Sequence, residues 1–389
     1  MIAVITATAV SGVTIAATIP ASARAGLLEA RAAAAAAGLA SAAKDPVPVP
    51  KNEVGGPELA GHGIVVHYPP GGRPLPKVPA SAYVIANAGT GSVLAAKDAH
   101  GLFPPASTLK VLTAITMLPR LRPNATVLAS KRATSVEPNI VGLIAGHRYK
   151  VADLFHALLL ISANDAAVAL VEAAGSFSKG MALLNAEAHH LQAYDVVAKY
   201  PNGLPAKGQV VSAYDLALIA RAALGIPAFM KYDAMRTARF PVKRHKHVLL
   251  VNQNYLITKY KGGLGGKIGW TLKAGATYIG MARRSGVTLI VTILHARPLT
   301  EIASAEKLLN WGFANAGHVR RVGVLVPPLA AARHTKKPSA TGNPLAAASA
   351  GSGDGAVIGA SVAAGVCACV LGGLAWLRRR ALLGRRRSS

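Results

Sequence analysis

Cysteine and acidic residues are both scarce in this 389-residue sequence, and each shortage excludes a class of protein. The two cysteines, Cys367 and Cys369, stand in an apolar stretch near the C-terminus, so neither a disulfide scaffold nor a cysteine-ligated zinc site is expected. Only 15% of the residues are charged and 52% are hydrophobic, which excludes a disordered polar or acidic chain. The length allows one large hydrophobic core or two.

The few acidic residues leave a large positive charge. Lysine and arginine total 43 against 16 acidic residues, a net charge of +27, which suits nucleic acid, an anionic membrane or an anionic cell wall. The basic run 243–247 lacks the interleaved aromatic residues of a nucleic-acid stacking platform, and its cations would repel a metal ion from His245 and His247. We therefore expect no nucleic acid, no metal and no cofactor, and favour wall polymers or lipid head groups as the use of the charge.

Both ends of the chain resemble membrane-targeting segments. Residues 2–21 are uncharged and precede small-residue cleavage patterns, which predicts a signal peptide over 1–25, with a buried N-terminal helix as the alternative. Residues 357–377 are also uncharged and long enough to cross a bilayer, and arginines follow at 378–380 and 385–387. The positive-inside rule predicts a transmembrane helix with a cytoplasmic tail over 378–389, and places the rest of the chain on the outer face.

Between these ends the composition predicts one globular block flanked by linkers. An alanine-rich and then Pro/Gly-rich linker is expected over 26–80, a globular domain over 81–326 and a second linker over 327–356. Within the block, apolar runs predict a hairpin at 83–96, helices in the middle and strands near its end, followed by a helix over 300–313. This order predicts an α/β fold of the α+β type, with an antiparallel sheet closed by the first and last segments and a helical insertion.

Three polar motifs stand in order along the block: Ser107-x-x-Lys110, Ser162-x-Asn164 and Lys267-x-Gly269. A serine hydroxyl needs a base to become a nucleophile, and a lysine one helical turn away is within reach. Burial and the nearby ammonium of Lys267 would lower the pKa of Lys110 and so keep its amine neutral. Each motif alone is weak, but their order and contexts together indicate a nucleophilic serine site.

With these motifs the sequence resembles the serine-type D-alanyl-D-alanine carboxypeptidases, the low-molecular-mass penicillin-binding proteins. The similarity covers roughly residues 81–316. Its most similar segments are Pro104-Pro105-Ala106-Ser107-Thr108-Leu109-Lys110, Ile161-Ser162-Ala163-Asn164-Asp165, Pro201-Asn202-Gly203 and Ser212-Ala213-Tyr214-Asp215. The resemblance implies a five-stranded antiparallel sheet of the β-lactamase and transpeptidase type. It also implies a peptidoglycan stem peptide ending in D-Ala-D-Ala as substrate, and β-lactams as covalent inhibitors.

The resemblance also implies a role for each motif residue. Ser107 is implied as the acylated nucleophile, Lys110 as its base and Ser162 as a proton relay to the leaving amine. The residues implied to bind substrate are Asn164, Lys267, Gly269, Trp270 and Thr271. Among these, Lys267 would bind the terminal carboxylate, and the N–H group of Trp270 would share the oxyanion with that of Ser107.

One position departs from the family pattern, because Ile268 stands where the family usually has threonine. A hydroxyl group that would help to hold the carboxylate is therefore missing, with Thr271 or an arginine as possible substitutes. Two other functions stay open at this stage. A β-lactamase would need a glutamate to activate water, but Glu172 and Glu187 lie outside the expected context. A catalytically impaired wall-binding module of the same fold would not be acylated by penicillin.

Overall fold

The computed structural model describes residues 54–68, 70–243 and 246–330. The expected signal peptide (1–25), membrane helix (357–377) and basic tail (378–389) lie outside the described residues, as does most of each expected linker. Within the described ranges, no single helix is both long and apolar enough to span a membrane, although two bent helix pairs pass the test by length and composition.

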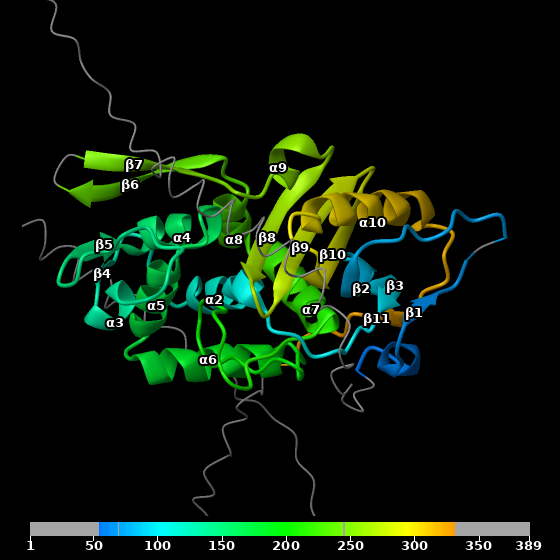
Figure 1. The fold of residues 1–389 in the computed structure, drawn as a ribbon, viewed down its shortest axis with the longest axis horizontal. Helices are drawn as coiled ribbons and strands as arrows, with labels where there is room; N and C mark the ends of the chain where they lie inside the picture. The colour runs from blue at the N-terminus through cyan, green and yellow to red at the C-terminus, as the bar shows by residue number, and fades with distance from the viewer. Residues whose placement is uncertain (1–53, 69, 244–245, 331–389) are drawn as a thin grey trace, which may run out of the picture. The chain divides into compact units, whose positions relative to one another are not determined.

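A seven-stranded antiparallel sheet forms the centre of the fold (Figure 1). Its strands lie in the order β1-β3-β2-β10-β9-β8, and the short strand β11 pairs with β3. The strands are β1 (Ile64–Val66), β2 (Ala80–Asn87), β3 (Ser92–Lys97), β8 (Gly263–Thr271), β9 (Gly275–Arg284), β10 (Val287–Ala296) and β11 (Gly323–Val324). The pairing of β2 with β10 closes the sheet between the first and last segments of the block, as the sequence predicted.

Five of these strands are the expected ones, and β1 and β11 are additions at the β3 edge. The proline and glycine content of the segment before residue 80 predicted a linker, yet its last part contributes the short 3-10 helix η1 (Pro57–Ala60) and β1. Leu59 of η1 is buried, and a Cβ on Gly323 of β11 would lie only 2.5 Å from its Cδ1 atom. The globular block therefore begins before residue 81, its predicted first residue.

Helices cover both faces of the sheet. Leu289, Val291 and Ile293 of β10 belong to a core cluster with residues of α10 (Glu301–Asn315), whereas Ile290 and Leu294 belong to the core cluster that includes α7 (Ala213–Leu224). Side chains on a strand point to alternate faces, so a strand with a helix on each face is apolar almost throughout. This explains why β10 is a nearly continuous apolar run in the sequence.

The helical part of the fold is built around α2 (Leu109–Met117), which is buried along its whole length. Its neighbours are α4 (Val151–Leu160), α5 (Asn164–Glu172), α6 (Phe177–His190) and α7. The remaining helices are α3 (Lys131–Thr134), α8 (Pro227–Asp233) and α9 (Leu256–Lys259). Two further antiparallel pairs each form a two-stranded sheet: β4 (Thr126–Leu128) with β5 (Arg148–Lys150), and β6 (Thr237–Lys243) with β7 (Lys246–Val251). The one-turn 3-10 helix η2 (Ala106–Thr108) precedes α2 and packs against β8 and β9, so the start of α2 meets the edge of the sheet.

Candidate active site

The turn that carries Ser107 is held in place by the sheet. Ala106 has a positive φ of 45°, a conformation that L-residues rarely adopt, and Ser107 follows it inside η2. The carbonyl oxygen of Pro105 accepts hydrogen bonds from the hydroxyl groups of Thr108 and of Thr277 on β9, at 2.5 and 3.0 Å. Two hydroxyl groups from different elements therefore fix the backbone directly before the serine.

Lys110 is fully buried one turn after Ser107. Its Nζ atom lies 2.8 Å from Ser107 Oγ, 2.7 Å from Asn164 Oδ1 and 2.8 Å from the carbonyl oxygen of Asn202. Burial lowers the pKa of Lys110 well below its usual value, and the charge of Lys267 lowers it further, against a smaller raising effect of Asp165. The neutral amine is therefore favoured.

The three contacts of Lys110 decide where the lone pair of that amine points. The oxygens of Asn164 and Asn202 are carbonyl oxygens, which only accept hydrogen bonds, so they take the two N–H groups of a neutral amine. The remaining direction is toward Ser107, whose hydroxyl group then donates to the lone pair. This arrangement is the one that a base needs in order to remove the hydroxyl proton.

Ser162 and Asn164 lie at the break between α4 and α5. Ser162 has a positive φ of 63°, and its hydroxyl group is buried without a hydrogen-bond partner among the described residues. The Asn164 side chain accepts a hydrogen bond from Lys110 and donates one to the carbonyl oxygen of Glu137 at 2.8 Å, so both ends of its carboxamide bond within the protein. The carboxylate of Asp165 accepts hydrogen bonds from the N–H groups of residues 141, 142 and 143 and so fixes the loop that contains these residues.

The third motif lies on β8, which is an edge strand of the sheet. Lys267 is 4% exposed, and its Nζ donates to the carbonyl oxygen of Ile268 at 2.8 Å. A Cβ on Gly269 would lie 2.6 Å from the backbone nitrogen of Ser107, so only glycine allows this approach of strand and serine. The third motif thus contacts the first where Gly269 lies against the backbone of Ser107.

The other residues of the motif divide between the two faces of the strand. Ile268 and Trp270 pack against the apolar cluster that contains residues of α10, on the face opposite to Lys267, Gly269 and Thr271. Thr271 Oγ1 accepts the N–H group of Ala274 at 3.0 Å, and its own proton has no acceptor among the residues that the structure describes. The side chain of Ile268 therefore has an apolar environment, and only the backbone of Trp270 can face the serine.

Two residues at the site were not singled out as site residues from the sequence, Asn202 and Gly203. Asn202 contributes a backbone carbonyl, which any residue would carry, and Gly203 lies against the backbone of Ala106. The sequence feature that pointed to these two residues was the segment Pro201-Asn202-Gly203, which the family resemblance covers. A turn with an asparagine and a glycine at positive φ indicates geometry, but it does not say what the turn contacts.

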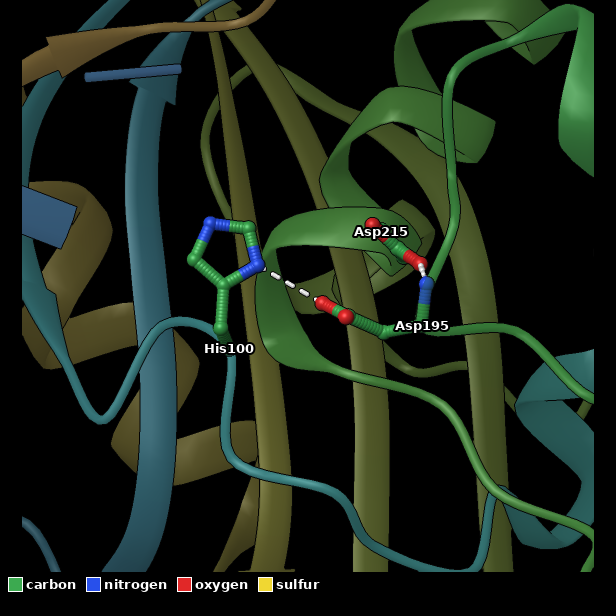
Figure 2. Close-up of side chains that lie close together, drawn as sticks. All are labelled: His100, Asp195 and Asp215. Carbon is green, nitrogen blue, oxygen red and sulfur yellow. Dashed lines mark hydrogen bonds and ion pairs between the residues drawn. The ribbon is translucent and has the colours of Figure 1, made fainter. Parts of the chain in front are cut away.

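A second cluster of titratable side chains lies apart from these motifs: His100, Asp195 and Asp215 (Figure 2). The His100 ring bonds to Asp195 Oδ2 at 2.6 Å and to the carbonyl oxygen of Val54 at 3.0 Å, while Asp215 Oδ2 accepts the N–H group of Asp195 at 2.7 Å. Burial and the charge of Asp195 raise the pKa of Asp215. An imidazole nitrogen and a carboxylate oxygen at this separation are hydrogen-bonded. The cluster therefore joins the start of the described chain to α7 through hydrogen bonds.

Comparison with known proteins places the described block among peptidases. A family model described as D-alanyl-D-alanine carboxypeptidase matches residues 71–298. The D-alanyl-D-alanine carboxypeptidase DacB2 of Mycobacterium tuberculosis is 38% identical over 252 residues, which cover 63% of this chain and 86% of that protein. The carboxypeptidase DacF of Bacillus subtilis is 27% identical, and the match covers 60% of this chain and 62% of that one.

Solved structures agree with these matches. A D-alanyl-D-alanine carboxypeptidase from M. tuberculosis superposes with a TM-score of 0.63 at 37% identity, covering 66% of this chain and 99% of that one. A DD-transpeptidase variant of Streptomyces gives a TM-score of 0.58 at 26% identity, covering 61% and 99%. The fold described here, an antiparallel sheet flanked by helices, is therefore the fold of these enzymes.

Proposed function

The chain belongs to the D-alanyl-D-alanine carboxypeptidase family, and we propose that it removes the terminal D-alanine from peptidoglycan stem pentapeptides through an acyl-enzyme on Ser107. The observation that carries this assignment is the position of Lys110, whose Nζ lies 2.8 Å from Ser107 Oγ while two carbonyl oxygens occupy its other directions. Penicillins would acylate the same serine, because their strained amide presents a carbonyl carbon to the same nucleophile.

In the acylation step, Ser107 Oγ attacks the carbonyl carbon of the penultimate D-alanine, and its proton passes to Lys110 Nζ. The carbonyl oxygen becomes negative between the N–H groups of Ser107 and Trp270, where two donors stabilise the charge. The bond to the terminal D-alanine then breaks, and its nitrogen receives the proton from Lys110 through Ser162. The buried hydroxyl group of Ser162, which has no partner among the described residues, supports this relay.

The carboxylate of the leaving D-alanine is assigned to Lys267 and the hydroxyl group of Thr271. Thr271 lies on the same strand face as Lys267 and retains a proton to donate, so it takes the place of the hydroxyl group missing at Ile268. Water then attacks the ester on Ser107 and gives its proton to Lys110. The bond between Ser107 Oγ and the acyl carbon then breaks, Oγ takes the proton back from Lys110, and the shortened peptide leaves as a carboxylic acid.

The first test is to incubate the full-length chain with a fluorescent penicillin, map the label by mass spectrometry, and assay free D-alanine from a peptide ending in D-Ala-D-Ala. We expect label on Ser107 together with D-alanine release. Rapid loss of the label without peptide cleavage would indicate a β-lactamase instead. A folded protein with neither label nor release would mean that the activity is lost, and would favour a wall-binding role.

We further propose that the enzyme acts on the outer face of the cell membrane, held by a single helix over residues 357–377. The supporting features are the uncharged stretch itself, the arginines that follow it and the signal-like residues 1–25. Protease added to intact cells should remove the globular block and spare an epitope placed on the arginine tail. Loss of the tail epitope with the block protected would reverse the proposed orientation.

A further inference from the structure

A buried carboxyl group that the proposed mechanism does not use lies beside the third motif. Asp233 is the last residue of α8 and is 1% exposed. Its Oδ1 atom has no hydrogen-bond partner among the described residues. Burying a carboxylate without a full set of partners costs free energy, and the C-terminal end of a helix is the end that disfavours negative charge. A charged Asp233 is therefore stable at this position only if another interaction offsets the free-energy cost of its burial.

Asp233 contacts the edge of β8 directly before Lys267. Its Oδ2 atom accepts the N–H group of Gly266 at 2.6 Å. A Cβ on the preceding residue, Gly265, would lie 2.1 Å from the same oxygen, so the absence of a side chain there makes room for the carboxyl group. The side chain of Asn252 donates to the carbonyl oxygens of Asp233 and Met235, both at 2.9 Å, and fixes the end of α8.

This contact lies on the free edge of the strand. In an antiparallel strand the N–H and C=O groups of alternate residues point to the same edge, so those of residues 266, 268 and 270 share the edge that β9 does not occupy. Asp233 takes the first of these positions, and Lys267 Nζ binds the carbonyl oxygen of the second. The third, Trp270, carries the N–H group assigned to the oxyanion. One strand edge therefore binds the carboxyl group and the ammonium group and also carries the N–H group assigned to the oxyanion.

Lys267 is buried and needs a counter-charge in order to stay protonated. Burial lowers the pKa of Lys267 to about 8, and Asp233 is the group that acts against this lowering. Burial in turn raises the pKa of Asp233 to about 7, against the opposing effects of the Gly266 N–H group and of Lys267. The two side chains thus stabilise each other's charged forms near neutral pH.

We propose that Asp233 is a positioning residue for the substrate carboxylate, because it fixes the β8 edge at Gly266 and supplies the counter-charge that keeps Lys267 an ammonium group. This inference rests on the proposed function, in which Lys267 binds the carboxylate of the terminal D-alanine. Without Asp233, Lys267 would lose its proton at a lower pH, and the carboxylate would lose its partner. Lys110 would keep the lowered pKa that its burial causes, which is the larger effect, so Ser107 would still be acylated.

Other carboxylates lie farther along the neighbouring elements: Asp165 acts on Lys110, and Glu301 and Glu306 act on Tyr278, whereas the carboxylate that acts on Lys267 is Asp233. Lys110, from α2, is a second amine, and its pKa is lowered by burial and then by the charge of Lys267. Tyr278, from β9, is a buried phenol whose pKa is raised by burial and by Asp233. Next to Asp233 on α8, the ring of Tyr232 contacts His156 of α4, and burial and then the charge of Asp153 raise the pKa of that tyrosine. Among the groups that act on Lys267, Asp233 is the one that raises its pKa.

The test is the pH profile of the full-length enzyme carrying Asp233→Asn, because asparagine keeps an oxygen for the Gly266 N–H group and removes only the charge. We expect the alkaline limb of kcat/KM to move about one pH unit lower, since an opposite charge nearby shifts a pKa by about one to three units. At pH 8.5 kcat/KM should fall about tenfold through KM, with kcat at saturation little changed. The same peptide as a C-terminal amide should show no difference between variant and wild type.

Asp98→Asn is the matched control, because Asp98 is a half-buried aspartate directly after β3 that accepts the N–H group of Gly63. It should leave the pH profile in place. An unmoved alkaline limb in folded Asp233→Asn would overturn the inference, whereas a wild-type chain without penicillin label or D-alanine release would overturn the proposed function itself. If the variant does not fold, the ε-carbon NMR signal of Lys267 in the wild type should show a step near pH 7 as Asp233 titrates. A signal without that step would contradict the proposal.

Discussion

Replacing Lys110 with methionine is expected to lower the acylation rate of Ser107 by at least about 10³-fold, for both peptide and penicillin, because a positioned base typically contributes factors of about 10² to 10⁴. Methionine fills a similar volume but offers no lone pair for the serine proton and no N–H group for Asn164 and Asn202. Stopped-flow labelling with a fluorescent penicillin measures the rate directly. Acylation within tenfold of wild type would show that another group acts as the base.

Ser107→Ala is the matched control for this substitution, because it removes the nucleophile and leaves the base in place. It should abolish covalent labelling while a penicillin still binds reversibly. Lys110→Met, by contrast, should still label slowly, since its serine is intact. If the two variants label equally on a scale of hours, Lys110 is required for the serine to react at all.

The lowered pKa of Lys110 also predicts how the stability of the folded protein depends on pH. The folded state lowers the pKa of Lys110, so the unfolded chain binds more protons, and the wild type gains stability as the pH rises toward the unfolded value of 10.5. Methionine does not titrate. The melting temperature of Lys110→Met relative to wild type should therefore be highest at low pH and should fall as the pH rises from 6 to 9. A difference that stays constant with pH would contradict a neutral amine at this position.

The sequence predicted the parts of the site that depend on side-chain type and local spacing. A lysine three residues after a serine at a helix start lies within reach of it, and the structure places Lys110 Nζ 2.8 Å from Ser107 Oγ. Side chains alternate on a strand, so Lys267, Gly269 and Thr271 share one face and Ile268 lies on the other, where the structure packs it against the apolar cluster. The strands of the antiparallel sheet were also predicted from their apolar runs, because the spacing of apolar residues along a strand is visible in the local sequence.

What could not be predicted depends on contacts between distant segments of backbone. The carbonyl oxygen of Asn202 binds Lys110 from 92 residues away, and a backbone carbonyl has no signature in the sequence. Asp233 was not singled out, because its role depends on α8 meeting the β8 edge. Strand β1 was missed for a similar reason, since its three residues become a strand by pairing with β3. The physical cause in each case is tertiary pairing, which overrides local composition.

Backbone strain lies close to the reacting atoms on both sides of the site. Ala106 and Ser162 both have positive φ values, at 45° and 63°, and the first directly precedes the nucleophile. Residues held in such conformations cost about 1–3 kcal/mol each and persist only where the surroundings fix them. Around Ala106 those surroundings are the hydroxyl groups on the carbonyl oxygen of Pro105 and the close approach of Gly203. The geometry of the serine therefore depends on the turn at Gly203.

Gly203→Ala is accordingly expected to damage both folding and catalysis. A Cβ there would lie 1.7 Å from the carbonyl oxygen of Ala106 and 2.5 Å from its carbonyl carbon, and backbone atoms cannot rotate away. Either the serine turn or the Asn202 turn has to move, and each movement separates Lys110 from one of its partners. We expect about 3 kcal/mol lower stability from overpacking and from a positive φ of 80°, and acylation slowed by about 10²-fold or more.

Gly208→Ala separates the effect of the positive φ from the effect of the steric clash, because Gly208 has a similar φ of 75° but no atom within 4 Å of its Cβ position. It should cost about 1 kcal/mol in stability, the effect of the backbone conformation alone, and leave the acylation rate at the wild-type value. Chemical denaturation and penicillin labelling of both variants give the comparison. Equal losses in the two would mean that conformational strain explains Gly203, whereas slower acylation in Gly203→Ala alone would show that its contact with Ala106 positions the nucleophile.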